Sequence, residues 1–245
     1  MITQNKVALV TGASRGIGAA IARRLSEEGF SVAINYASNI TEAEKLVSEI
    51  KEAGGQAIAI QADVSDSAAA ARLFEETVTA FGGIDVFVNS AGIMKLAPLA
   101  DSDDTLFDSQ VAVNLKGAFN TLRLASRYLR EGGRIISLST SVIGLKLENY
   151  SVYAATKSAV ETLTVILSKE LRGRSITANV VAPGPTATDL FLHGKSPELI
   201  ERMSKMNPLE RLGTPDDIAY TVLFLASPQG GWINGQVLRA NGGMI

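Results

Sequence analysis

Three features of the sequence predict an α/β fold, in which helices cover both faces of one parallel β-sheet. Short β-branched runs alternate with longer segments of helical periodicity, which is the pattern of right-handed βαβ units. The short runs are apolar along their whole length, as strands buried on both faces are. No linker, repeat or low-complexity tract divides the 245 residues, so we expect a single, doubly wound domain over residues 1–245.

Seven runs are predicted to be the strands of this sheet. They cover residues 7–10, 31–36, 57–61, 85–89, 134–138, 176–181 and 236–239. Residues 1–10 are too short and too broken for a signal peptide, so we expect them to lead directly into the first strand.

Helical stripes and stop signals fill the intervals between the strands. Ile17, Ile21 and Leu25 share one helix face ahead of Gly29. Residues 41–44 (TEAE) have the sequence of a capping box, which would start a second helix. A third stripe consists of Leu73, Phe74, Thr77 and Phe81, and longer helices are expected over residues 104–130, 151–171, 197–205 and 215–226.

Charge and composition argue against several classes of protein. A net charge of −2 argues against nucleic acid or an anionic membrane as the main partner. With no cysteine and one histidine, His193, neither thiolate nor multi-histidine metal sites can form, so we expect no metal. Without a Gly-x-Ser-x-Gly elbow, a serine hydrolase is excluded. No apolar run reaches the roughly 18 residues of a membrane span, so we expect a soluble, cytoplasmic protein.

A glycine-rich segment, TGASRGIG over residues 11–18, follows the first strand and opens a helix. Gly12 permits a tight turn, Gly16 lets a pyrophosphate approach the backbone, and Gly18 allows close packing of the helix on the sheet. The free amides and the positive end of the helix then face the phosphates. We therefore predict a dinucleotide site at the carboxyl ends of the strands.

This octet resembles the short-chain dehydrogenase/reductase family, and the other marks of that family follow in order between residues 6 and 243. Residues 89–92 (NSAG) are similar to the family's Asn-Asn-Ala-Gly, with Ser90 in place of the second asparagine. The remaining marks are Asp63-Val64 after the third strand, Asn114, residues 141–144 (SVIG), residues 153–157 (YAATK) and residues 183–188 (PGPTAT). The resemblance implies a Rossmann-type sheet and a nicotinamide-dependent oxidoreductase.

The residues at the end of the second strand favour NADP(H) as the cofactor. NAD(H) stays open as the alternative. Residues 35–39 (NYASN) contain no acid where chains that prefer NAD place one, so a ribose phosphate would meet no repulsion. Arg15 can donate charge-assisted, bidentate hydrogen bonds to that phosphate; the alternative is that Arg15 is simply a solvated surface charge. Family members with this arginine and no acid generally use NADP(H). The predicted cofactor contacts are Gly12, Ser14, Arg15, Gly16, Ile17, Gly18, Asn35, Tyr36, Ala37, Ser38, Asn39, Asp63, Val64, Asn89, Ala91, Gly92, Tyr153, Lys157, Pro183, Gly184, Thr186 and Thr188.

Tyr153 and Lys157 are four residues apart and so share one face of a helix. A nearby ammonium stabilises a phenolate, so we expect Lys157 to lower the pKa of Tyr153 from its ordinary value of about 10. The phenol would then protonate the developing alkoxide of a ketone that receives a hydride. The resemblance also assigns Lys157 to the nicotinamide ribose. Tyr150 lacks a lysine at the same spacing.

Two further catalytic residues come from the resemblance. A hydroxyl that orients the substrate oxygen is assigned to Ser141 from the pattern Ser-Val-x-Gly. The interval to Tyr153 is twelve residues, whereas thirteen is more common in the family and would point to Thr140. Asn114 lies in an otherwise apolar helix, where it either caps a kink or, as the resemblance implies, holds a water linked to Lys157.

Apolar residues around Gly194 and Pro197 predict a substrate lid over residues 188–207, facing a wall of Met94, Leu96, Leu145 and Leu147.

The main hypothesis is an NADPH-dependent carbonyl reductase that acts on a ketone, a secondary alcohol or an acyl thioester. Within the family the chain is most similar to bacterial 3-oxoacyl-carrier-protein reductases, and an acyl carrier protein would dock on Arg127, Arg130, Arg172 and Arg174. The alternatives are a dehydrogenase of small or cyclic ketones and alcohols, and a non-catalytic nicotinamide-binding sensor or scaffold. The resemblance also implies a homotetramer.

Overall fold

A single parallel sheet forms the centre of the molecule. The computed structural model describes residues 6–245, in which seven strands pair in the order β3-β2-β1-β4-β5-β6-β7. Their bounds are β1 (Val7–Val10), β2 (Ser31–Tyr36), β3 (Gln56–Gln61), β4 (Ile84–Asn89), β5 (Leu129–Leu138), β6 (Thr177–Pro183) and β7 (Val237–Ala240). The predicted doubly wound α/β fold is confirmed. The first five residues of the predicted domain, including the start of the segment 1–10, lie outside the described part.

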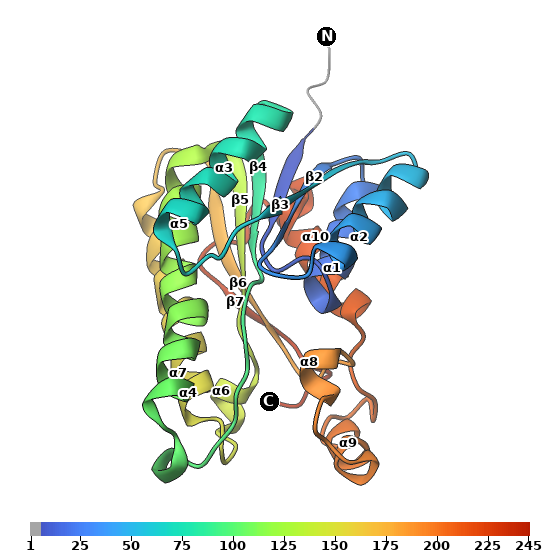
Figure 1. Cartoon of the computed structure of the whole chain (residues 1–245), viewed down its shortest axis with the longest axis vertical. Coiled ribbons are helices and arrows are strands. Elements are labelled where there is room, and N and C mark those ends of the chain that lie inside the picture. Colours follow the sequence, from blue (N-terminus) through green and yellow to red (C-terminus); the bar gives the residue numbers. More distant parts are fainter. Residues whose placement is uncertain (1–5) are drawn as a thin grey trace.

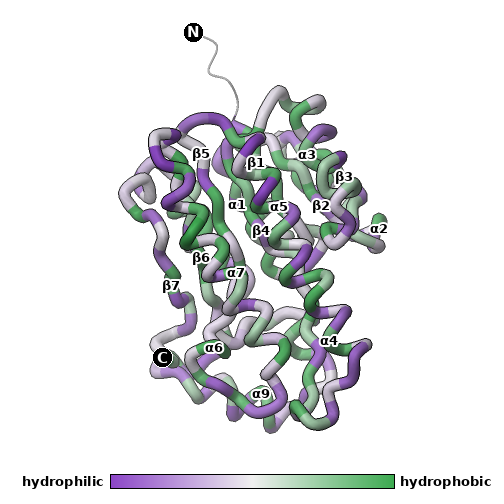
Figure 2. Tube along the Cα trace, turned by 90° about the vertical axis from the view of Figure 1, so that its left-hand side faces the viewer, coloured by the Kyte–Doolittle hydropathy of each residue, from purple (hydrophilic) through white to green (hydrophobic). Residues whose placement is uncertain are grey.

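Helices cover both faces of this sheet (Figure 1). One face carries α1 (Gly16–Glu27), α2 (Ile40–Glu52) and α10 (Pro215–Ala226), and the other carries α3 (Ser67–Phe81), α5 (Gly117–Tyr128) and α7 (Ser151–Glu170). Two apolar clusters fill the interfaces, one around Ile21, Leu25 and Val222 and the other around Phe74 and Phe87. In Figure 2 hydrophobic stretches run through the middle of the molecule, and hydrophilic stretches lie both in loops and along the outer helices.

Short elements gather beyond the carboxyl ends of the strands, in the lower part of Figure 1. They are α6 (Val142–Leu145) on one side and α8 (Asp189–Leu192) and α9 (Pro197–Ser204) on the other, with two 3₁₀ turns elsewhere at η1 (Leu99–Asp101) and η3 (Pro228–Gly230). The lid predicted over residues 188–207 therefore consists of α8, α9 and the segments that flank them. Within residues 6–245, no helix combines the length and apolar character that a membrane crossing requires.

The long helix predicted over residues 104–130 is interrupted. It consists of α4 (Asp104–Gln110), a π-helical turn η2 (Val111–Lys116) and α5, which ends at Tyr128. The chain leaves the helix earlier than predicted because Leu129 already pairs with Ile84, which extends β5 at its start. The π-helical turn contains Asn114, so the hydrogen-bond pattern of the helix changes at the residue for which a kink was one of the two alternatives.

The start of α2 also differs from the prediction. Asn39 is the N-cap, and its side chain accepts a hydrogen bond from the backbone N–H of Glu42. The capping box predicted at residues 41–44 was therefore wrong. An asparagine two residues earlier supplies the cap, and Thr41 lies inside the first turn.

Candidate active site

The glycine-rich loop between β1 and α1 has no room for a Cβ at Gly12 or Gly18. Gly12 and Gly16 have positive φ angles of 62° and 57°. A Cβ on Gly12 would lie 2.7 Å from Cα of Ala91, and one on Gly18 would lie 2.5 Å from the carbonyl oxygen of Gly12. No side chain caps the N-terminus of α1, so its first amides stay free for an anion. The loop thus fits the pyrophosphate of a dinucleotide.

Polar side chains beneath the loop fix its shape. The hydroxyl of Thr11 accepts hydrogen bonds from the N–H groups of Ser90 (3.0 Å) and Ala91 (3.2 Å) and so ties the loop to the end of β4. Asn35 is buried, and its side chain accepts from the N–H of Gly12 and donates to the carbonyl of Ala62. The Asn35 side chain therefore braces the loop instead of facing a ligand. The sequence prediction missed Thr11, although its place in the octet was a usable signal.

The remaining residues predicted for the adenosine half lie at the ends of β2 and β3. Ala37 and Ser38 are exposed, while the side chain of Asn39 is held by the α2 cap. The Asp63 carboxylate accepts from Ser65 N–H at 2.8 Å, and the Val64 carbonyl accepts from the Asn120 side chain. Arg15 is exposed, and in the described part of the chain it makes no ion pair. No carboxylate follows β2 before Glu42 in α2.

Two of the four predicted catalytic side chains, Asn114 and Lys157, converge, and Tyr153 lies on the same face of α7 as Lys157. Tyr153 and Lys157 lie buried on one face of α7, and Nζ of Lys157 donates to the carbonyl of Leu138 at 2.9 Å. Asn114 accepts from the N–H of Ile93 (2.8 Å) and donates to the carbonyl of the same residue (2.9 Å). A Cβ on Gly92 would lie 3.3 Å from both Asn114 Oδ1 and Lys157 Nζ, so these two side chains meet at Gly92.

The fourth residue, Ser141, is oriented differently from the prediction. Its hydroxyl donates to the carbonyl of Ala182 (3.0 Å) and accepts from Nδ2 of Asn241 (3.0 Å). The hydroxyl next to Tyr153 that acts on its pKa belongs to Thr140, and Thr140, Ser141 and Tyr153 line the same pocket. Ser141 is already the N-cap of α6, which turns its side chain toward β6, and Thr140 is the residue thirteen positions before Tyr153.

The ionisation of the pair also differs from the expectation. Burial raises the pKa of Tyr153 to about 12, Tyr150 acts in the same direction, and the neighbouring Thr140 hydroxyl opposes the rise. Burial lowers the pKa of Lys157 to about 8. The predicted lowering of the Tyr153 pKa is not found, because burial dominates, and the Lys157 ammonium donates to the Leu138 carbonyl. The phenol therefore keeps its proton at neutral pH and can give it to a substrate oxygen.

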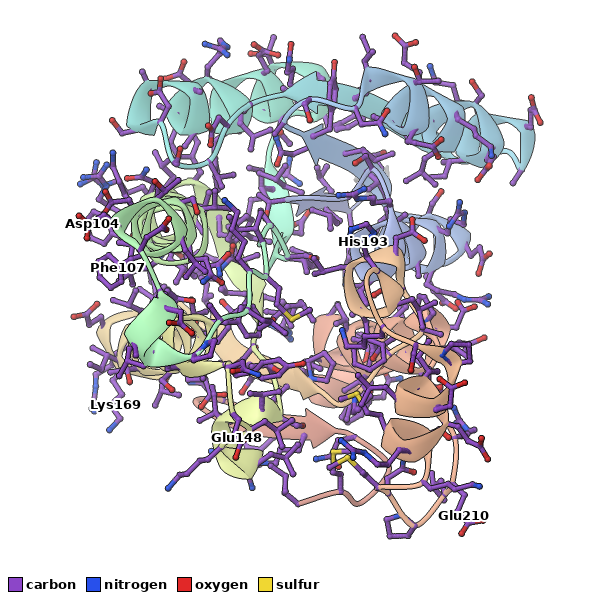
Figure 3. All side chains as sticks on the ribbon, turned by 60° about the horizontal axis from the view of Figure 1, so that its bottom comes forward. Asp104, Phe107, Glu148, Lys169, His193 and Glu210 are labelled. Atoms are coloured by element: carbon purple, nitrogen blue, oxygen red, sulfur yellow. The ribbon has the colours of Figure 1, made fainter. Side chains whose placement is uncertain are left out.

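An apolar pocket of about 110 Å³ lies over Tyr153 and Thr140. It is bounded by Met94, Leu145, Leu147, Phe191, Met203, Met206 and Met244, and it shares a wall with a larger cavity of about 1240 Å³ that reaches Arg15 and His193. The predicted wall of Met94, Leu96, Leu145 and Leu147 lines these two cavities. Glu148, after α6, and His193, after α8, both line the larger cavity, and Figure 3 shows these two residues on separate elements.

The segment after β6 joins this pocket to the glycine loop. The hydroxyl of Thr188 caps α8 by accepting from the N–H of Phe191. The methyl group of Thr188 would lie 3.6 Å from a Cβ on Gly16. Pro183 ends β6 as a buried residue, and the hydroxyl of Thr186 donates to the Gly184 carbonyl. Among residues 6–245, no group of acidic or histidine side chains is arranged to hold a metal ion.

Comparisons with known proteins agree with this geometry. A family profile described as "Enoyl-(Acyl carrier protein) reductase" matches residues 12–245. The chain is 46% identical to a "Short-chain type dehydrogenase/reductase" of Picea abies, over 98% of this chain and 92% of that protein. It is 43% identical to an "NADPH-dependent aldehyde reductase-like protein, chloroplastic" of Arabidopsis thaliana, over 98% and 94% of the two chains. A crystal structure of a short chain dehydrogenase from Burkholderia cenocepacia in complex with NADP matches with a TM-score of 0.93 at 38% identity, covering 98% of each chain.

Proposed function

Because the chain belongs to the short-chain dehydrogenase/reductase family and is an NADP-dependent oxidoreductase, we propose that it reduces the carbonyl group of apolar ketones or aldehydes. The observation that carries the proposal is the buried, protonated Tyr153 phenol, which lines an apolar pocket together with the Thr140 hydroxyl. When bound, NADPH supplies the hydride. The chain's own residues must then orient the carbonyl and protonate its oxygen.

Each catalytic residue has one task in this proposal. The Thr140 hydroxyl donates a hydrogen bond to the carbonyl oxygen, and the Tyr153 phenol gives its proton to that oxygen as negative charge develops there. Lys157, held by the Leu138 carbonyl, would contact the nicotinamide ribose. Asn114 keeps residues 92 and 93 in place beside Lys157 through its two hydrogen bonds to Ile93.

The cofactor would lie across the carboxyl ends of the strands. We propose that the glycine loop holds the pyrophosphate, Arg15 and Ser38 the ribose phosphate, and Asp63-Val64 the adenine. The nicotinamide half would lie against Asn89, Ala91, Gly92 and residues 183–188, next to Tyr153. The lid over residues 188–207 would close on this half, since Gly194 has a positive φ of 73° between α8 and α9 and Met203 and Met206 face the pocket.

A substrate panel tests the reaction class. Loss of NADPH absorbance is measured with apolar ketones, aldehydes, small cyclic ketones, 3-oxoacyl thioesters and enoyl thioesters. We expect turnover with the carbonyl compounds, because the two hydroxyl donors lie where the oxygen on the reacting carbon would sit. Turnover of enoyl thioesters alone would contradict carbonyl reduction. Tight NADPH binding without turnover of any compound would favour a sensor or scaffold.

The cofactor preference rests on Arg15. Arg15→Ala is expected to raise the KM for NADPH roughly 10–100-fold and to leave the KM for NADH nearly unchanged, because only the ribose phosphate loses a charged donor. Steady-state kinetics with both cofactors measures the effect. Arg23→Ala is the matched control, since Arg23 lies on the same helix and pairs with Glu49. An equal loss with both cofactors would contradict the role of Arg15.

Exposed apolar side chains support the proposed homotetramer. One set lies on the α4, α5 and α7 side of the molecule (Phe107, Phe119 and Ile166), and another lies on α10 and the segment before β7 (Phe224 and Trp232, the latter 98% exposed). Light scattering during size exclusion is expected to give four times the mass of 25.8 kDa. Phe119→Glu combined with Ile166→Glu should reduce this mass, whereas Lys51→Glu on α2 should not. A wild-type monomer would contradict the proposal.

The arginine patch offered for an acyl carrier protein does not serve this site. Arg127, Arg130, Arg172 and Arg174 lie around the amino ends of β5 and β6, opposite the catalytic pocket. Arg130 pairs with Asp85 (3.1 Å) and Arg174 with Glu131 (2.9 Å), so these two have partners within the chain. Acyl thioesters therefore stay in the panel as substrates without a proposed carrier surface. The cytoplasmic location also stays a prediction, since the relative from Arabidopsis is named as chloroplastic.

A further inference from the structure

We infer that the C-terminal tail, residues 241–245, is a specificity-determining wall of the substrate pocket and that Ser141 positions this tail. The inference rests on the proposed function, because it concerns the pocket over Tyr153 and Thr140. Met244 lines that pocket together with both residues, although it lies 91 positions after Tyr153 in the sequence. The size of the group beside the reacting carbonyl would therefore be limited by the side chain of Met244.

The tail is held by one buried asparagine. Nδ2 of Asn241 donates to the Ser141 hydroxyl at 3.0 Å. Oδ1 of Asn241 accepts from the backbone N–H groups of Gly243 (3.0 Å) and Met244 (3.3 Å). Because the Asn241 side chain bonds to Ser141 and also to the backbone of the tail, the position of Ser141 fixes where the Met244 backbone lies.

Ser141 is suited to hold the tail and unsuited to bind a substrate oxygen. The single proton of its hydroxyl is given to the Ala182 carbonyl, and one lone pair takes the bond from Asn241. The side chain is buried between the end of β6 and the tail. Although Ser141 also lines the pocket, this arrangement directs its hydroxyl proton to the Ala182 carbonyl and not toward a substrate.

The shape of the tail leaves it little freedom. Gly242 and Gly243 have φ angles of 69° and 85°, in the region that favours glycine. A Cβ on Gly242 would lie 2.6 Å from Oδ1 of Asn207, and one on Gly184 would lie 2.9 Å from Cα of Asn241. The side chain of Ile245 fills the space beside Gly144 in α6. The tail is thus packed between β6, α6 and the end of the lid segment.

Substitution of Met244 tests the wall directly. For Met244→Ala we expect the ratio of kcat/KM for a bulky aryl ketone to that for a small ketone to rise on the order of tenfold. Met244→Phe should change the ratio in the opposite direction, and the Kd for NADPH should stay the same in both variants. Gln236→Ala, at an exposed position before β7, is the control in the same C-terminal region. An unchanged ratio in both Met244 variants would overturn the inference.

Substitution of Ser141 tests the anchor with a readout that does not depend on activity. In Ser141→Ala we expect faster hydrogen exchange at the amides of Gly243 and Met244, and a selectivity shift toward the bulky ketone. Ser137→Ala is the matched control, because it removes a buried hydroxyl that bonds to Thr164 and not to the tail. Unchanged exchange, with kcat lowered alike for all substrates, would show that Ser141 acts on the reaction itself and would overturn the assignment. If the wild type reduces no carbonyl compound, the proposed function fails, and the exchange measurement still decides whether Ser141 holds the tail.

Discussion

Tyr153→Phe is expected to lower kcat for carbonyl reduction toward the upper end of the roughly 10²–10⁴-fold range typical of a lost general acid. The phenol is the proton source for the substrate oxygen in the proposed reaction, and phenylalanine keeps its ring and packing. The Kd for NADPH should change little, because the rest of the dinucleotide site is untouched. Pre-steady-state and steady-state rates of NADPH oxidation, together with a binding titration, measure both quantities.

Tyr150→Phe is the control for this variant. The Tyr150 ring lies 6.4 Å from the Tyr153 ring in an edge-on arrangement, so Tyr150 lines the same pocket without being the proposed proton donor. We expect Tyr150→Phe to lower kcat far less. A Tyr153→Phe enzyme with normal turnover, or a larger loss in Tyr150→Phe, would refute the assignment of the acid.

The pH dependence of kcat provides a second test of the role of Tyr153. Burial raises the pKa of Tyr153 to about 12, so the phenol holds its proton throughout the neutral range. Reduction needs the protonated phenol, so its kcat should be level near neutrality and fall only as the pH rises toward that pKa. Oxidation of the corresponding alcohol needs the phenolate, so its rate should rise over the same pH interval.

The parts of the site that lie on regular structure were the predictable ones. Apolar runs in the sequence predict the positions of the strands. The glycines after the first strand predict the loop, because only glycine tolerates the observed contacts with Ala91 and with the loop's own backbone. Tyr153 and Lys157 are correctly predicted to lie together, since the period of an α-helix places residues four apart on one face.

The incorrect predictions concern side chains whose direction depends on distant residues. Ser141 and Thr140 are adjacent hydroxyl residues, and the local sequence does not tell which one faces Tyr153. Their directions are decided by the Ala182 carbonyl and by Asn241, a residue 100 positions later in the sequence. Asn35 was likewise expected to face the cofactor, but the amide of Gly12 and the end of β3 supply its partners.

The pKa of Tyr153 was predicted in the wrong direction for a related reason. The spacing of Tyr153 and Lys157 shows that they share a helix face, but it does not show how deeply the phenol is buried. Desolvation by the surrounding lid and pocket residues dominates, and the Leu138 carbonyl at the end of β5 directs the ammonium of Lys157. Tertiary packing, which the local pattern does not encode, sets both effects.

Thr140→Ala is expected to lower kcat by roughly 10²–10³-fold, the loss typical when one hydrogen-bond donor to a developing oxyanion is removed. The Thr140 hydroxyl lines the pocket beside Tyr153, so its removal takes away the second donor to the substrate oxygen. Thr140→Ser should restore most of the rate because it keeps the hydroxyl, and Ser141→Ala should keep kcat for a small ketone within a few-fold. Since Thr140 also accepts a bond from the N–H of Val142 at 3.3 Å, thermal unfolding of each variant is measured to separate folding from catalysis. The prediction is wrong if Ser141→Ala shows the large loss and Thr140→Ala the small one, because the substrate oxygen would then be bound one residue later than the structure indicates.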